Sequence, residues 1–132
     1  MIFTDAELRY LASQPLGRLA TAQPDGTLQV SPVGFRVDEV TGTIDIGGHR
    51  MAESRKYRNV EDNGRAAFTV DDLASVQPWR PRCVEIRGHA ETAVDDAGEP
   101  VIRLHPERII SFGLDGDDAD VHRRVRHARD VG

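Results

Sequence analysis

Turn signals recur along this chain at short intervals, and they limit what the segments between them can become. They lie at Pro24-Asp25-Gly26, Thr41-Gly42, Asn63-Gly64 and Asp95 to Pro100. Proline fixes φ and glycine accepts φ > 0, so each of these positions favours a tight reversal of the chain. Six segments between the turns have the short length and composition of β-strands. They are Leu16–Gln23, Leu28–Val37, Thr43–Gly47, Arg65–Val70, Arg82–Glu91 and Val101–Leu114, the last broken by His105-Pro106 into one or two strands.

Two segments favour helix instead. Thr4 is followed three residues later by Glu7, which is the pattern of a capping box, and it predicts a helix from Asp5 to about Ser13. A second helix is expected from Met51 to Asp62, ended by Asn63-Gly64. The segment from Asp71 to Pro81 is expected to be a loop. The predicted fold is therefore mainly β: a six-stranded antiparallel barrel with short flanking helices.

The chain has 132 residues, which suits one domain, predicted over residues 1–115. The charged tail, residues 116–132, is first acidic and then basic, and we expect a short helix or no regular structure there. The net charge of -5 argues against nucleic acid as a partner. No apolar run is long enough for a membrane span and no signal peptide is evident. Cys83 is the only cysteine, which fits a reducing, cytoplasmic location.

The segment after the third strand contains a candidate phosphate site. Gly47-Gly48-His49 leads into a helix that carries Ser54, Arg55 and Lys56, and Lys56 is the only lysine of the chain. Free N–H groups at a helix start favour an anion, and the arginine and lysine side chains add donors and charge. Ser54 is expected to cap the helix or to donate a hydrogen bond to the anion. From spacing alone, a solvated basic helix face is the favoured interpretation of the same residues, because charged helices are common and no Walker motif is present.

Other residues give weaker signals. Pro32 interrupts the Leu28–Val37 strand, so this strand is expected to be an edge strand, to be bulged, or to face a ligand at that point. The five histidines show no metal-ligand spacing, so we predict no metal site. No nucleophile elbow is present, and no residue is assigned as catalytic.

Taken in order, nine segments of the chain resemble one family. They are the short N-terminal helix, L-G-R-L-A-T, P-D-G, Q-V-S-P-V-G-F, D-I-G-G-H, S-R-K-Y-R-N-V, R-A-A-F-T-V-D-D, W-R-P-R-C-V-E-I-R-G and H-P-E-R-I-I-S-F-G-L. This order is similar to that of the pyridoxamine phosphate oxidase-like split barrels, and within them to the branch of oxidoreductases that depend on the deazaflavin coenzyme F420. The resemblance covers Met1 to about Asp115.

The resemblance implies a homodimer with two cofactor sites at the subunit interface. It also implies hydride transfer between coenzyme F420 and an unsaturated or conjugated small organic substrate. The alternatives are an FMN-dependent oxidoreductase or oxidase on the same barrel, and a protein that binds a cofactor or a tetrapyrrole without turnover. Cys83 stands where flavin-binding relatives often have glutamine, which counts against FMN. The implied cofactor-binding residues are Val30, Ser31, Pro32, Val33, Gly47, Gly48, Ser54, Arg55, Lys56, Asn59, Trp79 and Arg80, the last two contributed by the same subunit or by its partner.

Overall fold

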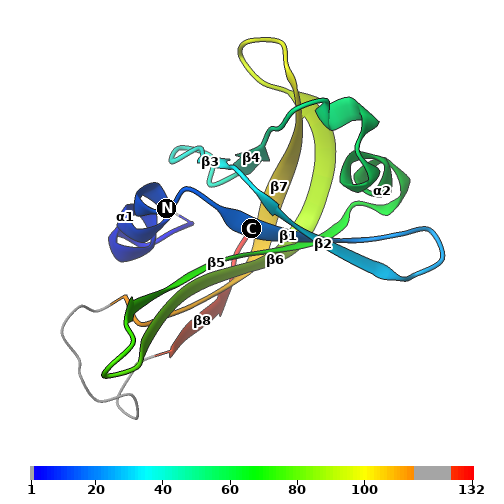
Figure 1. The fold of residues 1–132 in the computed structure, drawn as a ribbon. Helices are drawn as coiled ribbons and strands as arrows, with labels where there is room; N and C mark the ends of the chain where they lie inside the picture. Colours follow the sequence, from blue (N-terminus) through cyan, green and yellow to red (C-terminus); the bar gives the residue numbers. More distant parts are fainter. Residues whose placement is uncertain (1, 115–125) are drawn as a thin grey trace.

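The computed structural model describes residues 2–114 and 126–132, and its backbone is dominated by one antiparallel sheet (Figure 1). Along the described chain, the strands follow the order β2-β1-β5-β6-β7-β4-β3, with β8 paired to β7. The strands are β1 (Gly17–Ala22), β2 (Leu28–Val33), β3 (Arg36–Val37), β4 (Ile44–Ile46), β5 (Arg65–Ser75), β6 (Arg80–Val94), β7 (Pro100–Phe112) and β8 (Arg126–Asp130). The sheet curls around an apolar core, which confirms the predicted mainly β split barrel.

The first helix, α1 (Asp5–Ser13), has the predicted bounds and the predicted capping box. The Thr4 hydroxyl accepts from the Glu7 amide at 3.1 Å, and the Glu7 carboxylate accepts from the Thr4 amide at 2.9 Å. The second predicted helix divides into a 3-10 turn, η1 (Met51–Glu53), and α2 (Arg55–Asn63). Gly64 ends α2 with φ of 68°, as the Asn63-Gly64 signal predicts. Among the described helices, none is long and apolar enough to cross a bilayer.

The core lies inside the curl of the sheet, where the alternating side chains of the strands meet the apolar faces of both helices. Val84 and Ile86 of β6 are fully buried while their neighbours are less so, which is the alternation of a strand with one buried face. Leu104 and Ile109 of β7 both reach this core although they are five residues apart. An odd spacing would put them on opposite faces, and a bulge between them corrects the phase.

That bulge makes the predicted break at His105-Pro106 wrong, because β7 runs through both residues. Arg87 pairs with Arg108 and Gly88 with Pro106, which leaves Glu107 as the extra residue. A proline is tolerated at a bulge because the ladder is already interrupted there. A Cβ at Gly88 would lie 2.0 Å from the His105 carbonyl oxygen, so the close approach of the two strands requires glycine.

The predicted loop from Asp71 to Pro81 is also wrong. β5 continues to Ser75 and β6 begins at Arg80, so these residues form a long hairpin. Asp72 lies opposite Arg82 across the hairpin, and the two side chains form an ion pair at 2.6 Å. This pair neutralises the charge of Asp72, so an acidic residue is compatible with a strand at this position.

The charged tail also differs from its prediction. Residues 126–130 form β8, which pairs with β7 from Arg108 to Phe112, so most of the described part of the tail is a strand. The additional strand and the division of Leu28–Val37 into β2 and β3 give eight described strands instead of six. The predicted boundary at residue 115 falls at the start of a segment outside the described residues.

Candidate cofactor-binding site

The first turn of α2 carries several cationic side chains that form no ion pair with other described residues. The Ser54 hydroxyl accepts from the Tyr57 amide at 3.3 Å and donates to the Met51 carbonyl at 2.7 Å, so it caps the helix as predicted. Arg55, Lys56 and Arg58 follow, and among the described residues none of their side chains makes a hydrogen bond or ion pair. Unpaired cations beside free helix N–H groups can hold a phosphate.

The backbone beside Gly47 is open. Gly47 and Gly48 connect β4 to η1, and a Cβ built on Gly47 would meet no atom within 4 Å. Gly47 also lines a cleft of about 650 Å³. Its wall is mostly charged, with five acidic residues and two arginines, and its apolar part is formed by Phe35, Val37 and Val101. Clefts of this size accommodate drug-sized organic ligands. The glycine pair is therefore not required by packing within the chain, and a ligand has room to approach its backbone.

Strand β2 forms an edge of the sheet and, among the described strands, pairs only with β1. The position of Pro32 on an edge strand confirms the prediction made from the sequence. Val30 is 67% exposed and Val33 is buried, so the Val30–Val33 segment presents one free edge and one open face. The Ser31 hydroxyl is buried and has no hydrogen-bond partner in the structure. An edge strand with unpaired backbone groups and an orphan hydroxyl suits a flat ligand rich in hydrogen-bonding groups.

Asn59 occupies a different kind of position from the other candidates. Its side chain is 1% exposed, and its amide nitrogen donates to Thr21 Oγ1 at 3.1 Å and to Gln29 Oε1 at 3.3 Å. The donors of Asn59 are thus engaged between α2, β1 and β2. Thr21 and Gln29 were not identified from the sequence. The available signal was that each lies two residues from an inward-facing position, Leu19 or Ser31, and is therefore a polar residue on the inward face of its strand.

Trp79 and Arg80 lie at the tip of the β5–β6 hairpin, which Figure 1 shows at the opposite end of the sheet from α2. Ten residue-to-residue steps along β5 separate Arg65, next to α2, from Ser75. At about 3.3 Å per residue this is roughly 33 Å. Within one subunit the structure therefore does not bring Trp79 and Arg80 to the cations of α2. Trp79 is 54% exposed, and the buried Arg80 Nε has no hydrogen-bond partner.

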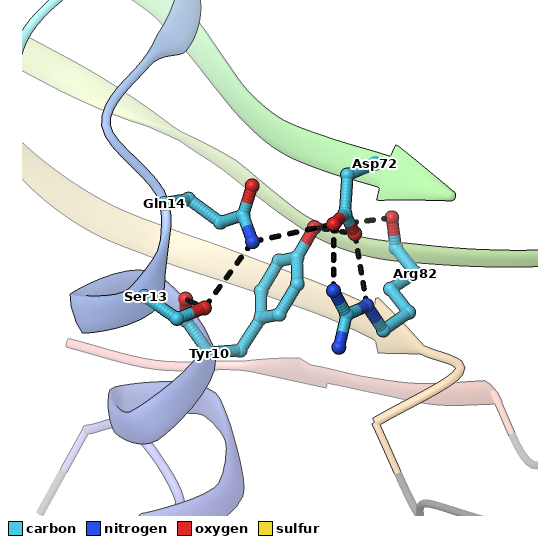
Figure 2. A network of polar contacts seen from close by, with 5 residues as sticks. All are labelled: Tyr10, Ser13, Gln14, Asp72 and Arg82. Carbon is cyan, nitrogen blue, oxygen red and sulfur yellow. Dashed lines mark hydrogen bonds and ion pairs between the residues drawn. The ribbon is translucent and has the colours of Figure 1, made fainter. Parts of the chain in front are cut away.

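The base of this hairpin is fixed by a polar network (Figure 2). The Asp72 carboxylate accepts from the Tyr10 hydroxyl at 2.8 Å, from Arg82 Nε at 2.9 Å and from Gln14 Nε2 at 3.3 Å. Burial, followed by the hydrogen bond to Asp72, raises the pKa of Tyr10, while the Arg82 guanidinium lowers the pKa of Asp72. A phenol with a raised pKa is a poor proton donor, so this network holds α1 to the hairpin rather than supplying acid chemistry.

The described residues give no sign of a reactive thiol or of a metal site. The Cys83 thiol is half-buried, and burial raises its pKa, which disfavours a reactive thiolate. Within residues 2–114 and 126–132, no three His, Cys, Asp or Glu side chains gather as metal ligands do.

Comparison with known proteins gives consistent results. The profile of the pyridoxamine 5'-phosphate oxidase family matches residues 3–113. The chain is 42% identical to the 5a,11a-dehydrotetracycline/5a,11a-dehydrooxytetracycline reductase of Streptomyces rimosus subsp. rimosus, over 100% of this chain and 99% of that protein. Among solved structures, a conserved hypothetical protein of Mycobacterium tuberculosis superimposes with a TM-score of 0.70 at 19% identity, covering 87% of this chain and 88% of that one. An F420 reductase superimposes with a TM-score of 0.57 at 26% identity, covering 73% of this chain and 90% of that one.

Proposed function

Because this chain belongs to the pyridoxamine 5'-phosphate oxidase family, we propose that it is a reductase that uses coenzyme F420 to reduce a conjugated organic molecule. The observation that carries this proposal is the 42% identity, along the whole chain, to a reductase of dehydrotetracyclines. The name of that relative specifies reduction of an unsaturated polycyclic compound. A substrate of that class is therefore proposed for this chain.

The choice of F420 is supported by the likeness to an F420 reductase and by the unpaired cations of α2. When bound, the reduced deazaflavin supplies a hydride, and the protein orients it and excludes water. Arg55, Lys56 and the Ser54 cap hold the phosphate in this proposal, with the open backbone of Gly47 and Gly48 beside it.

The ring system is proposed to lie along Val30–Val33, where the free edge of β2 and the Ser31 hydroxyl offer hydrogen bonds. The substrate is then proposed to occupy the cleft beside Gly47, where Phe35 and Val37 can contact its rings and the charged side chains of the same lining can contact its polar groups. The chain assigns no general acid, so the proton that accompanies the hydride is drawn from solvent.

A homodimer is part of the proposal, and the position of Trp79 and Arg80, far from α2 of their own subunit, suits a site that two subunits share. We expect light scattering coupled to size-exclusion chromatography to give about twice the chain mass of 14.6 kDa. A monomer that still binds cofactor would contradict the shared site. The single half-buried cysteine fits the proposed cytoplasmic location.

The function is tested by supplying the purified protein with reduced F420 and 5a,11a-dehydrotetracycline, and following the return of oxidised F420. Parallel titrations use FMN and haem. Turnover with F420 supports the proposal. Tight FMN binding with reduction of oxygen would move the protein to the flavin-dependent alternative. Tight binding of a cofactor without turnover of any acceptor would favour a binding protein.

A further inference from the structure

The proposed site is built on two elements that are not continuous in sequence. The cations that would hold phosphate lie on the first turn of α2, and the edge that would hold the ring lies on β2. A cofactor that bridges them binds well only when the two elements are held at one separation. The contacts between α2 and β2 therefore bear directly on cofactor affinity.

Asn59 provides the contact between these elements. Thr21 and Gln29, its two acceptors, are direct partners in the β1–β2 ladder, so one amide group bridges both strands. Gln29 directly precedes the Val30–Val33 segment, and Asn59 follows Lys56 by three residues, about one helical turn. This amide therefore links the helix that carries the cations directly to the strand that carries the proposed ring-binding edge.

The burial of these groups makes the contact specific. Asn59 is 1% and Thr21 is 2% exposed, so a shift of α2 along the strands would leave buried polar groups unsatisfied. An apolar interface tolerates small displacements, whereas a satisfied buried network selects one arrangement. A second bond, from Asn63 Nδ2 to the Ala22 carbonyl at 2.7 Å, fixes the other end of the helix to β1.

We propose that Asn59 is a positioning residue: through Thr21 and Gln29 it sets the separation between the cationic first turn of α2 and the free edge of β2, so that one F420 molecule engages both. This inference rests on the proposed function. It replaces the expected direct contact between Asn59 and the cofactor with an action through its two acceptors.

A ligand that spans both elements depends on their separation, whereas a ligand that occupies only one does not. The test therefore compares two fluorescent probes, F420 and the same deazaflavin riboside without its phosphate. Wild-type protein should bind F420 more tightly than the riboside. The dissociation constant of the riboside divided by that of F420 then measures how well the two elements act together. The Lys56→Ala variant should lower this ratio, which validates the ratio as a measure of phosphate binding.

Matched variants of the acceptors then test the inference. Thr21→Val and Gln29→Met remove an acceptor at nearly constant volume, and Thr21→Ser and Gln29→Glu retain one. We expect the first pair to bind F420 about tenfold more weakly, the range for loss of one buried hydrogen bond, with binding of the riboside changed less than about twofold. The second pair should stay close to wild type.

An equal loss for both probes would overturn the inference, because a merely structural or a direct ring-binding role weakens both. Unchanged F420 binding in Thr21→Val and Gln29→Met would overturn it as well. Wild-type protein that binds no F420 would overturn the proposed function together with the inference, and this outcome is distinguished by being visible before any variant is made.

Discussion

Replacing Arg129 with methionine should destabilise the protein strongly, because it isolates a buried carboxylate. Glu7 is 1% exposed and accepts two hydrogen bonds from Arg129, at 2.6 and 3.0 Å, and one from Ser111 at 2.6 Å. Removing one member of a buried ion pair costs about 3–5 kcal/mol. The lower end applies here, since the Arg129 side chain is 30% exposed and water can replace part of its contact. We expect a loss of about 3 kcal/mol, or a fall in Tm of roughly 10 °C.

The pH dependence of this loss tests its cause. Burial raises the pKa of Glu7, but the hydrogen bonds from Arg129, Ser111 and the Thr4 amide outweigh burial and hold it below its ordinary value of 4.5. In the wild type this contribution is complete above pH 4.5 and is lost as the pH falls through the lowered pKa. In Arg129→Met the hydrogen bonds and the charge of Arg129 are lost, so the pKa of Glu7 should lie above its wild-type value and the variant should gain relative stability as Glu7 takes up a proton. The difference between the two proteins should therefore shrink from neutral pH toward pH 4.5.

Urea denaturation followed by circular dichroism measures both effects. Arg108→Met is the matched control, because its ion pair with Asp130 also involves β8 but Asp130 is 83% exposed. Exposed pairs contribute little, so this control should stay within about 0.5 kcal/mol of wild type. An Arg129→Met loss below about 1 kcal/mol, or a loss that does not change between pH 7 and pH 4.5, would refute the reasoning.

Three further variants test separate features of the structure. Tyr10→Phe removes the hydroxyl that donates to Asp72 at 2.8 Å, and urea denaturation should show a loss of about 1.5–3 kcal/mol, the range for a hydrogen bond to a charged group; a change near zero would mean that the contact is replaced by water. Gly88→Ala places a Cβ 2.0 Å from the His105 carbonyl oxygen, so it should lower the free energy of unfolding by about 1–3 kcal/mol, and an unchanged Tm would contradict the close approach of β6 and β7. Lys56→Ala should weaken F420 binding by about 1.5–3 kcal/mol, roughly 10- to 150-fold, with little change in Tm; equal affinity in a fluorescence titration would place the phosphate elsewhere.

Local signals predicted most of the fold. The capping box at Thr4 and Glu7, the stop at Gly64 and the alternation of Val84 and Ile86 all depend on neighbouring residues, and the structure confirms each of them. The sequence predictions were wrong where a distant partner overrides a local signal. Asp72 resembles a loop residue until Arg82 pairs with it across the hairpin.

In the tail and in the site, too, features set by neighbouring residues could be predicted, whereas features set by a distant partner could not. Arg129 looked like part of a solvated charge run because its partner, Glu7, lies 122 residues away. The roles suggested for Ser54 and Pro32 follow from local geometry, since a cap and an edge proline are recognisable from a few residues. The engagement of Asn59 by Thr21 and Gln29 depends on how a helix packs on two strands, which no short segment encodes.

The free edge of β2 has a consequence for aggregation. Backbone groups that are open to a ring are also open to a strand of another molecule, and Leu28 and Val30 beside them are exposed and apolar. Such edges promote intermolecular β-pairing unless something interrupts them. Pro32 offers no N–H and so breaks the row of donors that an incoming strand would need. One residue thus leaves the edge accessible to a small planar molecule while protecting it from polymerisation.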